Sequence, residues 1–148
     1  MSWQVFEEAA PATAAYAVGR LAGRVAYLAT VRPDGGPRVH PVTPIVGAGR
    51  LFLFMEPTSP KGRDLQRDGR YALHCGVEDN SGGEGEVLVN GRGVLVDAPT
   101  LRAAAIASAS YQPNDRYILF ELLVERVDVT IYEPGGVRRE RWRAEGVA

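Results

Sequence analysis

Two tight turns early in this sequence constrain its fold more than any other feature. The stretches RPDGGP (32–37) and GAG (47–49) are rich in the residues that tight turns require. They separate three apolar segments, 24–31, 38–46 and 50–56, that are typical of β-strands. Parallel neighbours need long crossover connections, so strands joined by such turns must be antiparallel. The sequence therefore predicts an antiparallel sheet.

The rest of the chain adds three strands and three short helices. The predicted strands are 70–77, 87–97 (interrupted at Asn90–Gly93) and 117–133 (bent or bulged near its middle), and the predicted helices are 11–22, 59–68 and 99–109. Six long strands with helices between them indicate an α+β fold. Their edges must be hidden, which favours a closed or partly closed barrel.

Composition limits the classes of function. The 148 residues suit a single domain over 1–148, with an N-terminal helix and a short basic C-terminal tail. A net charge of -1 gives no basic field for nucleic acid, and no apolar run is long enough to span a membrane. The N-terminus does not resemble a secretory signal, and the single cysteine, Cys75, suits a reducing compartment. We therefore expect a cytoplasmic protein.

The helix predicted at 59–68 begins with unfavourable charges. Ser59 can cap it and Pro60 suits its first position, but Lys61, the only lysine in the chain, and Arg63 then place two cations in the first turn. That end of a helix already carries about half a positive charge, so each cation there costs about 0.3–1 kcal/mol. Either the cations are solvated, or Ser59, Lys61, Gly62 and Arg63 surround an anion such as a phosphate.

The strand predicted at 38–46 contains Pro41 and Pro44. Proline donates no ladder hydrogen bond, so this strand lies at an edge, is bulged, or faces something other than another strand. His40 lies on the face opposite Val39 and is either a surface residue or a cofactor contact. No closely spaced His, Cys and carboxylate pattern indicates a metal site, and Cys75 is expected to be a buried, inert thiol.

Three segments together resemble a known family. The segment TSPKGRDL after strand LFLFME resembles the phosphate-binding segment of the pyridoxamine 5′-phosphate oxidase-like flavin-binding split barrels. The stretch LATVRPDGGPRVHPVTP is similar to the opening hairpin of that family, and VLVNGRGVLVD to its strand with a central glycine. The resemblance covers about residues 20–133.

The resemblance implies a six-stranded antiparallel split β-barrel with short peripheral helices. It also implies an obligate homodimer with a cofactor in each of two clefts at the dimer interface, and it favours FMN over a deazaflavin coenzyme and both over haem. One strand would follow the cofactor ring, and the helix start would hold its phosphate. The polar, glycine-rich composition of 78–86 separately indicates a mobile loop, which could lie over the cleft. The implied cofactor-binding residues are Arg38, Val39, His40, Pro41, Val42, Thr43, Ser59, Lys61, Gly62 and Arg63.

The resulting hypothesis is a flavin- or deazaflavin-dependent oxidoreductase that acts on a small molecule. The rival hypothesis is a non-catalytic protein that binds or senses such a cofactor or haem. No residue is identified as catalytic. The stretch RRERW is only distantly similar to the substrate-phosphate site of the family, so a vitamin B6 phosphate is not the expected substrate. Apolar strand residues such as Leu51, Leu53 and Phe54 are expected to need cover from a second copy.

Overall fold

The computed structural model describes residues 1–81 and 83–147, and Gly82 and Ala148 lie outside the described residues. The helices of this part of the chain are α1 (Trp3–Ala9), α2 (Pro11–Leu21), α3 (Pro60–Arg67) and α4 (Pro99–Ser108). The strands are β1 (Ala26–Val31), β2 (Pro37–Val42), β3 (Ile45–Gly47), β4 (Arg50–Met55), β5 (Arg70–Cys75), β6 (Glu86–Val96), β7 (Ile118–Glu133) and β8 (Gly136–Arg143).

All strand pairs of the described chain are antiparallel, in the order β2-β1-β5-β6-β7-β4-β3, with β8 paired to β7. The predicted α+β class and antiparallel sheet are confirmed, but the predicted number of six strands is wrong. The strand expected at 38–46 breaks at Thr43–Pro44 into β2 and β3, because Pro44 cannot continue the ladder. The eighth strand is β8, in the segment expected to be a tail.

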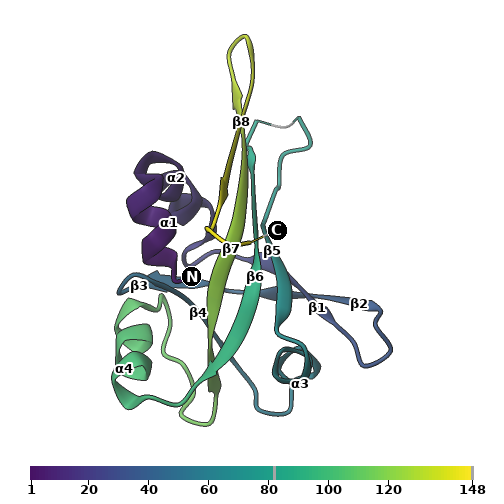
Figure 1. The fold of residues 1–148 in the computed structure, drawn as a ribbon, viewed down its shortest axis with the longest axis vertical. Helices are drawn as coiled ribbons and strands as arrows, with labels where there is room; N and C mark the ends of the chain where they lie inside the picture. Colours follow the sequence, from purple (N-terminus) through teal and green to yellow (C-terminus); the bar gives the residue numbers. More distant parts are fainter. Residues whose placement is uncertain (82, 148) are drawn as a thin grey trace.

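The two ends of the sheet are formed by strands that are consecutive in the chain. β2 is the outer strand on one side and β3 on the other, so the sheet must curve round until the short Thr43–Pro44 link joins them. Figure 1 shows this arrangement, with the β1–β2 hairpin projecting to one side and α3 below it. Pro41 is tolerated because β2 pairs only with β1 and has a free edge.

The interior of the curved sheet forms the main core, which α1 and α2 close at one side (Figure 1). Trp3 and Phe6 of α1 are completely buried, and the Phe6 ring lies 5.2 Å from that of Trp142 on β8. The sequence analysis did not predict α1 or β8. Each is short, and each is held by packing against the other and against the sheet.

The apolar residues of β4 are buried by their own chain. Leu51, Leu53 and Phe54 are 0%, 1% and 8% exposed. The expectation that these side chains need cover from a second copy is therefore wrong. Leu51 and Leu53 lie in the main core, and Phe54 lies in a second cluster with residues of α4 and β7. Other apolar side chains are exposed to solvent. Val39 and Tyr27, on the outer face of β2 and β1, have exposed fractions of 64% and 47%.

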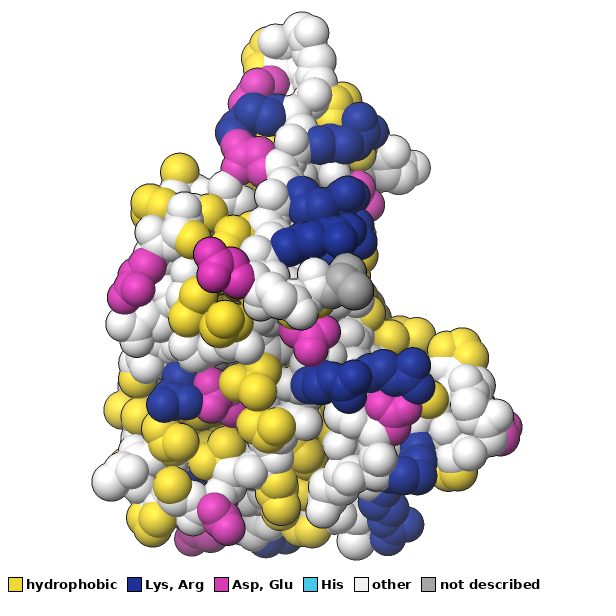
Figure 2. Space-filling model, in the orientation of Figure 1, with side chains coloured by type: hydrophobic (Ala, Val, Ile, Leu, Met, Phe, Trp, Pro, Cys, Tyr) yellow, Lys and Arg dark blue, Asp and Glu magenta, His cyan; other side chains and the backbone are white. Residues whose placement is uncertain are grey.

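The basic C-terminal segment is a strand in which two of the four arginines pair with acidic residues. Arg141 of β8 and Arg126 of β7 both bond to Asp128, and Arg138 pairs with Glu133 and Glu140. Figure 2 shows Lys and Arg side chains gathered over the upper part of the molecule with acidic groups among them. This segment is therefore part of the sheet and not a free cationic tail.

A β-bulge interrupts the longest strand pair. The register between β6 and β7 shifts between Asn90 and Gly91, which pair with Arg126 and Val124, so Glu125 is the extra residue. The interruption predicted in 87–97 and the bulge predicted in 117–133 are this one feature. A Cβ atom on Gly91 would overlap the carbonyl oxygen of Leu123, which is backbone and cannot move aside.

We therefore expect Gly91→Ala to destabilise the protein by about 1–3 kcal/mol or more, which lowers the melting temperature by roughly 5–10 °C. The matched control is Gly19→Ala in α2, where an added Cβ meets nothing within 4 Å. That change should raise the melting temperature, because alanine is the better helix former. Equal melting temperatures for Gly91→Ala and the wild type would contradict the description of the bulge.

Candidate functional site

The start of α3 keeps two polar donors available. The Ser59 hydroxyl accepts a hydrogen bond from the Gly62 N–H at 3.2 Å, and the Ser59 carbonyl accepts one from the Arg63 N–H at 3.1 Å. Pro60 has no N–H. Within the described chain no acceptor bonds the Lys61 N–H, and the Ser59 hydroxyl can still donate its own proton. The predicted cap is confirmed, and it leaves fewer free backbone donors than the sequence suggests.

Lys61 is a partly buried cation without a carboxylate partner. No carboxylate of the described residues lies within 4.0 Å of its Nζ atom, although most other buried or half-buried cations are paired. Burial lowers the pKa of the Lys61 ammonium. An anion beside Nζ would restore that pKa and supply the missing partner. Arg63 in the same turn is exposed and does not line the neighbouring cleft.

A cleft of about 300 Å³ adjoins Lys61. It is bounded by the end of β2 and the link that follows, by the end of β4, and by the segment before β7. The lining residues are Pro41, Val42, Thr43, Phe54, Met55, Glu56, Lys61, Tyr111 and Tyr117. The fold thus brings Lys61 together with three of the six residues predicted from the strand at 38–43.

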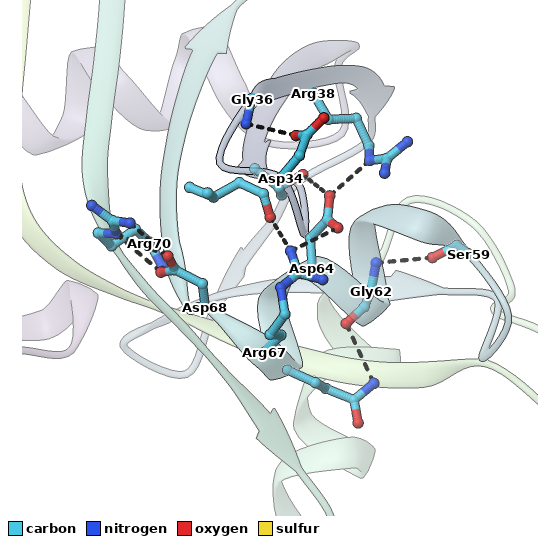
Figure 3. A network of polar contacts seen from close by, with 12 residues as sticks. Asp34, Gly36, Arg38, Ser59, Gly62, Asp64, Arg67, Asp68 and Arg70 are labelled. Atoms are coloured by element: carbon cyan, nitrogen blue, oxygen red, sulfur yellow. Dashed lines mark hydrogen bonds and ion pairs between the residues drawn. The ribbon is translucent and has the colours of Figure 1, made fainter.

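Arg38 of β2 does not line the cleft, but its side chain contacts α3 (Figure 3). Its Nε donates to Oδ2 of Asp64 at 2.7 Å, and the Thr30 hydroxyl donates to the same oxygen at 2.8 Å. The other carboxylate oxygen accepts from Arg67 at 3.1 Å, and Arg67 also bonds the Val31 carbonyl. The buried carboxylate of Asp64 therefore fastens α3 to both β1 and β2. Asp64 was not predicted from the sequence.

His40 and Val39 point to opposite sides of β2. His40 is exposed and lies opposite Leu28, on the face that α3 covers further along the strand. Partial burial and the nearby charges of Lys61 and Arg38 lower the pKa of the His40 imidazole. Val39 lies on the outer face, away from α3. His40 therefore belongs with the cationic side chains, and Val39 does not.

Gly62 serves packing within the chain. A Cβ atom at this position would lie 3.0 Å from the Met55 sulfur and 3.0 Å from the Ser59 hydroxyl oxygen. Gly62 is buried, so the helix can approach β4 closely only without a side chain here. This contact explains the glycine independently of any ligand.

Two tyrosines of the cleft were not predicted. Tyr111 and Tyr117 flank the segment that leads from α4 into β7, and two arginines hold that segment in place. Arg102 donates to the Tyr117 carbonyl at 2.7 Å and lies over the Phe54 ring at 5.1 Å, and Arg116 pairs with Glu56. The sequence signal was weak, since YQPNDRY has the composition of an ordinary loop.

The other candidates from the sequence lie outside the cleft. Cys75 is 1% exposed and accepts a hydrogen bond from the Val87 N–H at 3.2 Å, as expected of a structural thiol. In the loop 78–86, Gly82 lies outside the described residues. Glu84 of this loop bonds the amides of Glu78 and Asp79, and its carbonyl accepts from Tyr16 of α2. The described part of the loop therefore lies beside α2 and not over the cleft of its own chain.

Among the described residues, no group of three or more His, Cys, Asp or Glu side chains is placed to hold a metal ion. None of the described helices has both the length and the apolarity needed to cross a membrane.

Asp64 gives the fold a measurable acid sensitivity. Burial alone would raise the pKa of its carboxyl, but hydrogen bonds from Arg38, Thr30 and Arg67 outweigh burial and lower the pKa below 3.8. The stabilisation is thus fully present above the unfolded-state pKa and is lost as the pH falls below it. We expect Asp64→Asn to lower the melting temperature by about 5 °C at pH 7. This gap in melting temperature between the wild type and the variant should close between about pH 5 and pH 2.

The control is Asp97→Asn, an exposed carboxylate without an ion pair in the described chain, which should show no gap at any pH. A gap for Asp64→Asn that does not change with pH would mean that the charge of the carboxylate is unimportant.

Comparison with known proteins places the chain among its relatives. The family model described as Pyridoxamine 5′-phosphate oxidase matches residues 14–131, which is most of the chain. No curated protein matches the sequence.

Solved structures share the fold at low identity. A heme binding protein from Mycobacterium smegmatis has a TM-score of 0.66 at 21% identity over 85% of this chain, which spans only 55% of that protein. PhzG from Burkholderia lata 383, in complex with tetrahydrophenazine-1-carboxylic acid, has a TM-score of 0.64 at 17% identity over 95% of this chain and 87% of its own. General Stress Protein 26 from Bacillus anthracis str. Sterne has a TM-score of 0.65 at 16% identity over 88% and 97%.

Proposed function

This chain belongs to the pyridoxamine 5′-phosphate oxidase family, and on that premise we propose that it binds FMN in the cleft beside α3 and acts as a flavin-dependent oxidoreductase on a small molecule. The observation that carries the proposal is Lys61, a partly buried ammonium at a helix start with no carboxylate partner among the described residues. A phosphate dianion is the ligand that this arrangement favours.

Residues in and around the cleft would hold FMN in two parts. The phosphate would be held by the Lys61 ammonium and N–H, the Ser59 hydroxyl and the free end of Arg38, with Arg63 and His40 adding positive field. The ring would lie along the backbone of Pro41–Thr43, beside Tyr111 and Tyr117. When bound, the flavin supplies the hydride chemistry, and the protein supplies binding, orientation and exclusion of water. We assign no proton-transfer residue.

A deazaflavin coenzyme, which also carries phosphate, is the alternative cofactor. The second candidate function is the binding or sensing of a cofactor without catalysis. The likeness to a heme binding protein supports this second candidate. The structure of PhzG with a bound small molecule supports the enzymatic proposal. Because the sequence identities to these two structures are about 20% or lower, the structures support either candidate function only by sharing the fold.

We also propose that the cofactor site is completed in a homodimer. The exposed apolar side chains of Val39 and Tyr27 lie together on the outer face of β1 and β2, where Ala29 of β1 pairs with Val39. A second copy would cover this face. Sedimentation at micromolar concentration should give a dimer, and a stable, well-folded monomer that binds cofactor would contradict a site shared between two chains.

The visible absorption spectrum of the purified protein, and of the protein after titration with FMN, tests the function. We expect the spectrum of a bound flavin, and the reduced flavin should then be reoxidised when a small-molecule acceptor is added. A haem spectrum would favour the second candidate, as would bound FMN that does not turn over. Absence of any cofactor binding would overturn both.

A further inference from the structure

Asp64 is the one buried acid on α3, and it lies one helical turn beyond Lys61. It is 1% exposed and does not line the cleft. Its two oxygens accept hydrogen bonds from three groups, the Thr30 hydroxyl, Arg38 Nε and Arg67. A buried carboxylate so near a proposed phosphate site repels the phosphate, so its presence there requires a reason.

The bond to Arg38 supplies that reason. Asp64 uses only the Nε atom of Arg38, and no other described residue accepts a hydrogen bond from the two terminal nitrogens. In Figure 3 those nitrogens point away from Asp64, toward the side of the view where Ser59 and the start of α3 lie. Arg38 and His40 lie two residues apart on the same face of β2, and the charges of Lys61 and Arg38 both lower the pKa of the His40 imidazole. Arg38 is about one-quarter exposed, and its free end can reach a ligand.

We propose that Asp64 is a positioning residue: it grips Arg38 by Nε so that the terminal nitrogens complete the phosphate site formed by Lys61 and Ser59. An unrestrained arginine would have to give up its rotamer freedom when the ligand binds, whereas a held guanidinium has already done so. The fork of Arg38 allows this division of labour, because one edge faces Asp64 and the other remains free. The inference rests on the proposed function.

Two substitutions separate positioning from charge. Asp64→Asn and Asp64→Ala both remove the negative charge, but only alanine removes the acceptor oxygen that holds Arg38. We expect Asp64→Ala to weaken FMN binding about tenfold, the lower end for loss of one charge-assisted hydrogen bond, and Asp64→Asn to stay within about threefold of the wild type. If Asp64 acted only through its charge, both variants would bind FMN more tightly, and the proposal would be overturned.

Riboflavin, which lacks the phosphate, is the control ligand. Its affinity should be the same for the wild type and for Asp64→Ala. If Asp64 merely kept the cleft folded, affinities for FMN and riboflavin would fall together. Melting of each ligand-free variant shows whether it is folded at the temperature of the titration.

A double-mutant cycle on FMN binding tests the route through Arg38. In an Arg38→Ala background, adding Asp64→Ala should cause no further loss of FMN affinity. An equal tenfold loss in both backgrounds would show that Asp64 acts through the fold, which would overturn the proposal.

Arg38→Lys is the second variant in case Asp64→Ala does not fold. It keeps the ion pair with Asp64 but lacks the fork, so we expect FMN affinity to fall about tenfold while the ligand-free protein melts normally. Full affinity would contradict the proposal. If Lys61→Glu abolishes FMN binding but neither Asp64→Ala nor Arg38→Lys changes it, only this inference fails. If the wild type binds no FMN, the proposed function fails and this inference with it.

Discussion

Lys61→Glu is expected to weaken FMN binding by more than a hundredfold while leaving the ligand-free protein as stable as before, or slightly more so. Losing one charge-assisted bond costs about 1.5–3 kcal/mol, which is roughly ten- to hundredfold, and the new carboxylate also repels the phosphate. In the ligand-free protein the same change places an acid at a helix N-terminus and relieves repulsion of His40. These effects are worth about 0.3–1 kcal/mol, or up to about 4 °C.

The matched control for this experiment is Arg63→Glu, which makes the same charge reversal in the same helical turn. Arg63 is exposed and does not line the cleft, so its reversal should weaken FMN binding less. Fluorescence titration and melting of the ligand-free protein are measured on both variants. Equal losses would mean that FMN senses only a general positive field. Unchanged affinity with Lys61→Glu would leave α3 as an ordinary capped helix with solvated cations.

Thr43→Trp is expected to abolish FMN binding without unfolding the protein. Thr43 lies in the short link between β2 and β3, is partly exposed, and lines the cleft. An indole there would fill much of the cleft of about 300 Å³ in which we propose that the cofactor binds. Because Thr43 belongs to no strand, the larger side chain can point into the cleft with little change to the sheet. We expect a loss of at least a hundredfold and a melting temperature close to that of the wild type.

The companion variant Thr43→Ala tests whether the link acts through its backbone. Its FMN affinity should remain within about tenfold of the wild type, or about 1.4 kcal/mol. Full FMN affinity in Thr43→Trp would place the ring outside this cleft. Loss of affinity in both variants would mean that the threonine hydroxyl itself contacts the ligand.

Features encoded by a few neighbouring residues could be predicted from the sequence. The GAG turn was recognised from its glycines, and Gly49 indeed has a positive φ of 71°; Ala48 adopts a φ of 54° although its Cβ atom disfavours it. The Ser59 cap and the alternation of apolar residues in β1 and β5 are likewise local. Such patterns define the elements and, through tight turns, the antiparallel pairing.

Features that depend on distant partners could not be predicted. Helix α1 has seven residues and no side-chain cap, and it is held by Trp3 and Phe6 packing against residues such as Trp142. Strand β8 has the composition of a charged tail, and its pairing with β7, which places Arg141 beside Asp128, is not visible in the local sequence. The burial of β4 depends on which elements cover it, which periodicity does not show.

The residues of the candidate site likewise fall into those that the sequence reveals and those that it does not. Lys61 was visible because a cation in the first turn of a helix is locally unfavourable. Asp64, Tyr111 and Tyr117 were not, because their importance arises only when α3, β2 and the segment before β7 come together. The ligand itself, and the residue that would move a proton, are set by chemistry that no local pattern in this chain reveals.

The meeting of β2 and β3 at the Thr43–Pro44 link has a consequence for how the protein folds. The cleft draws on residues 41–43, 54–61 and 111–117, so it cannot exist until β4 has paired with β7, which sets Phe52 opposite Glu121. Pairing across such a sequence separation carries a large loop-closure entropy and tends to be slow. We therefore expect the cleft to form late in folding. A ligand that binds only to the formed cleft stabilises the folded state of the whole chain. Substitutions that destabilise the fold far from the cleft should therefore lower the apparent affinity for that ligand.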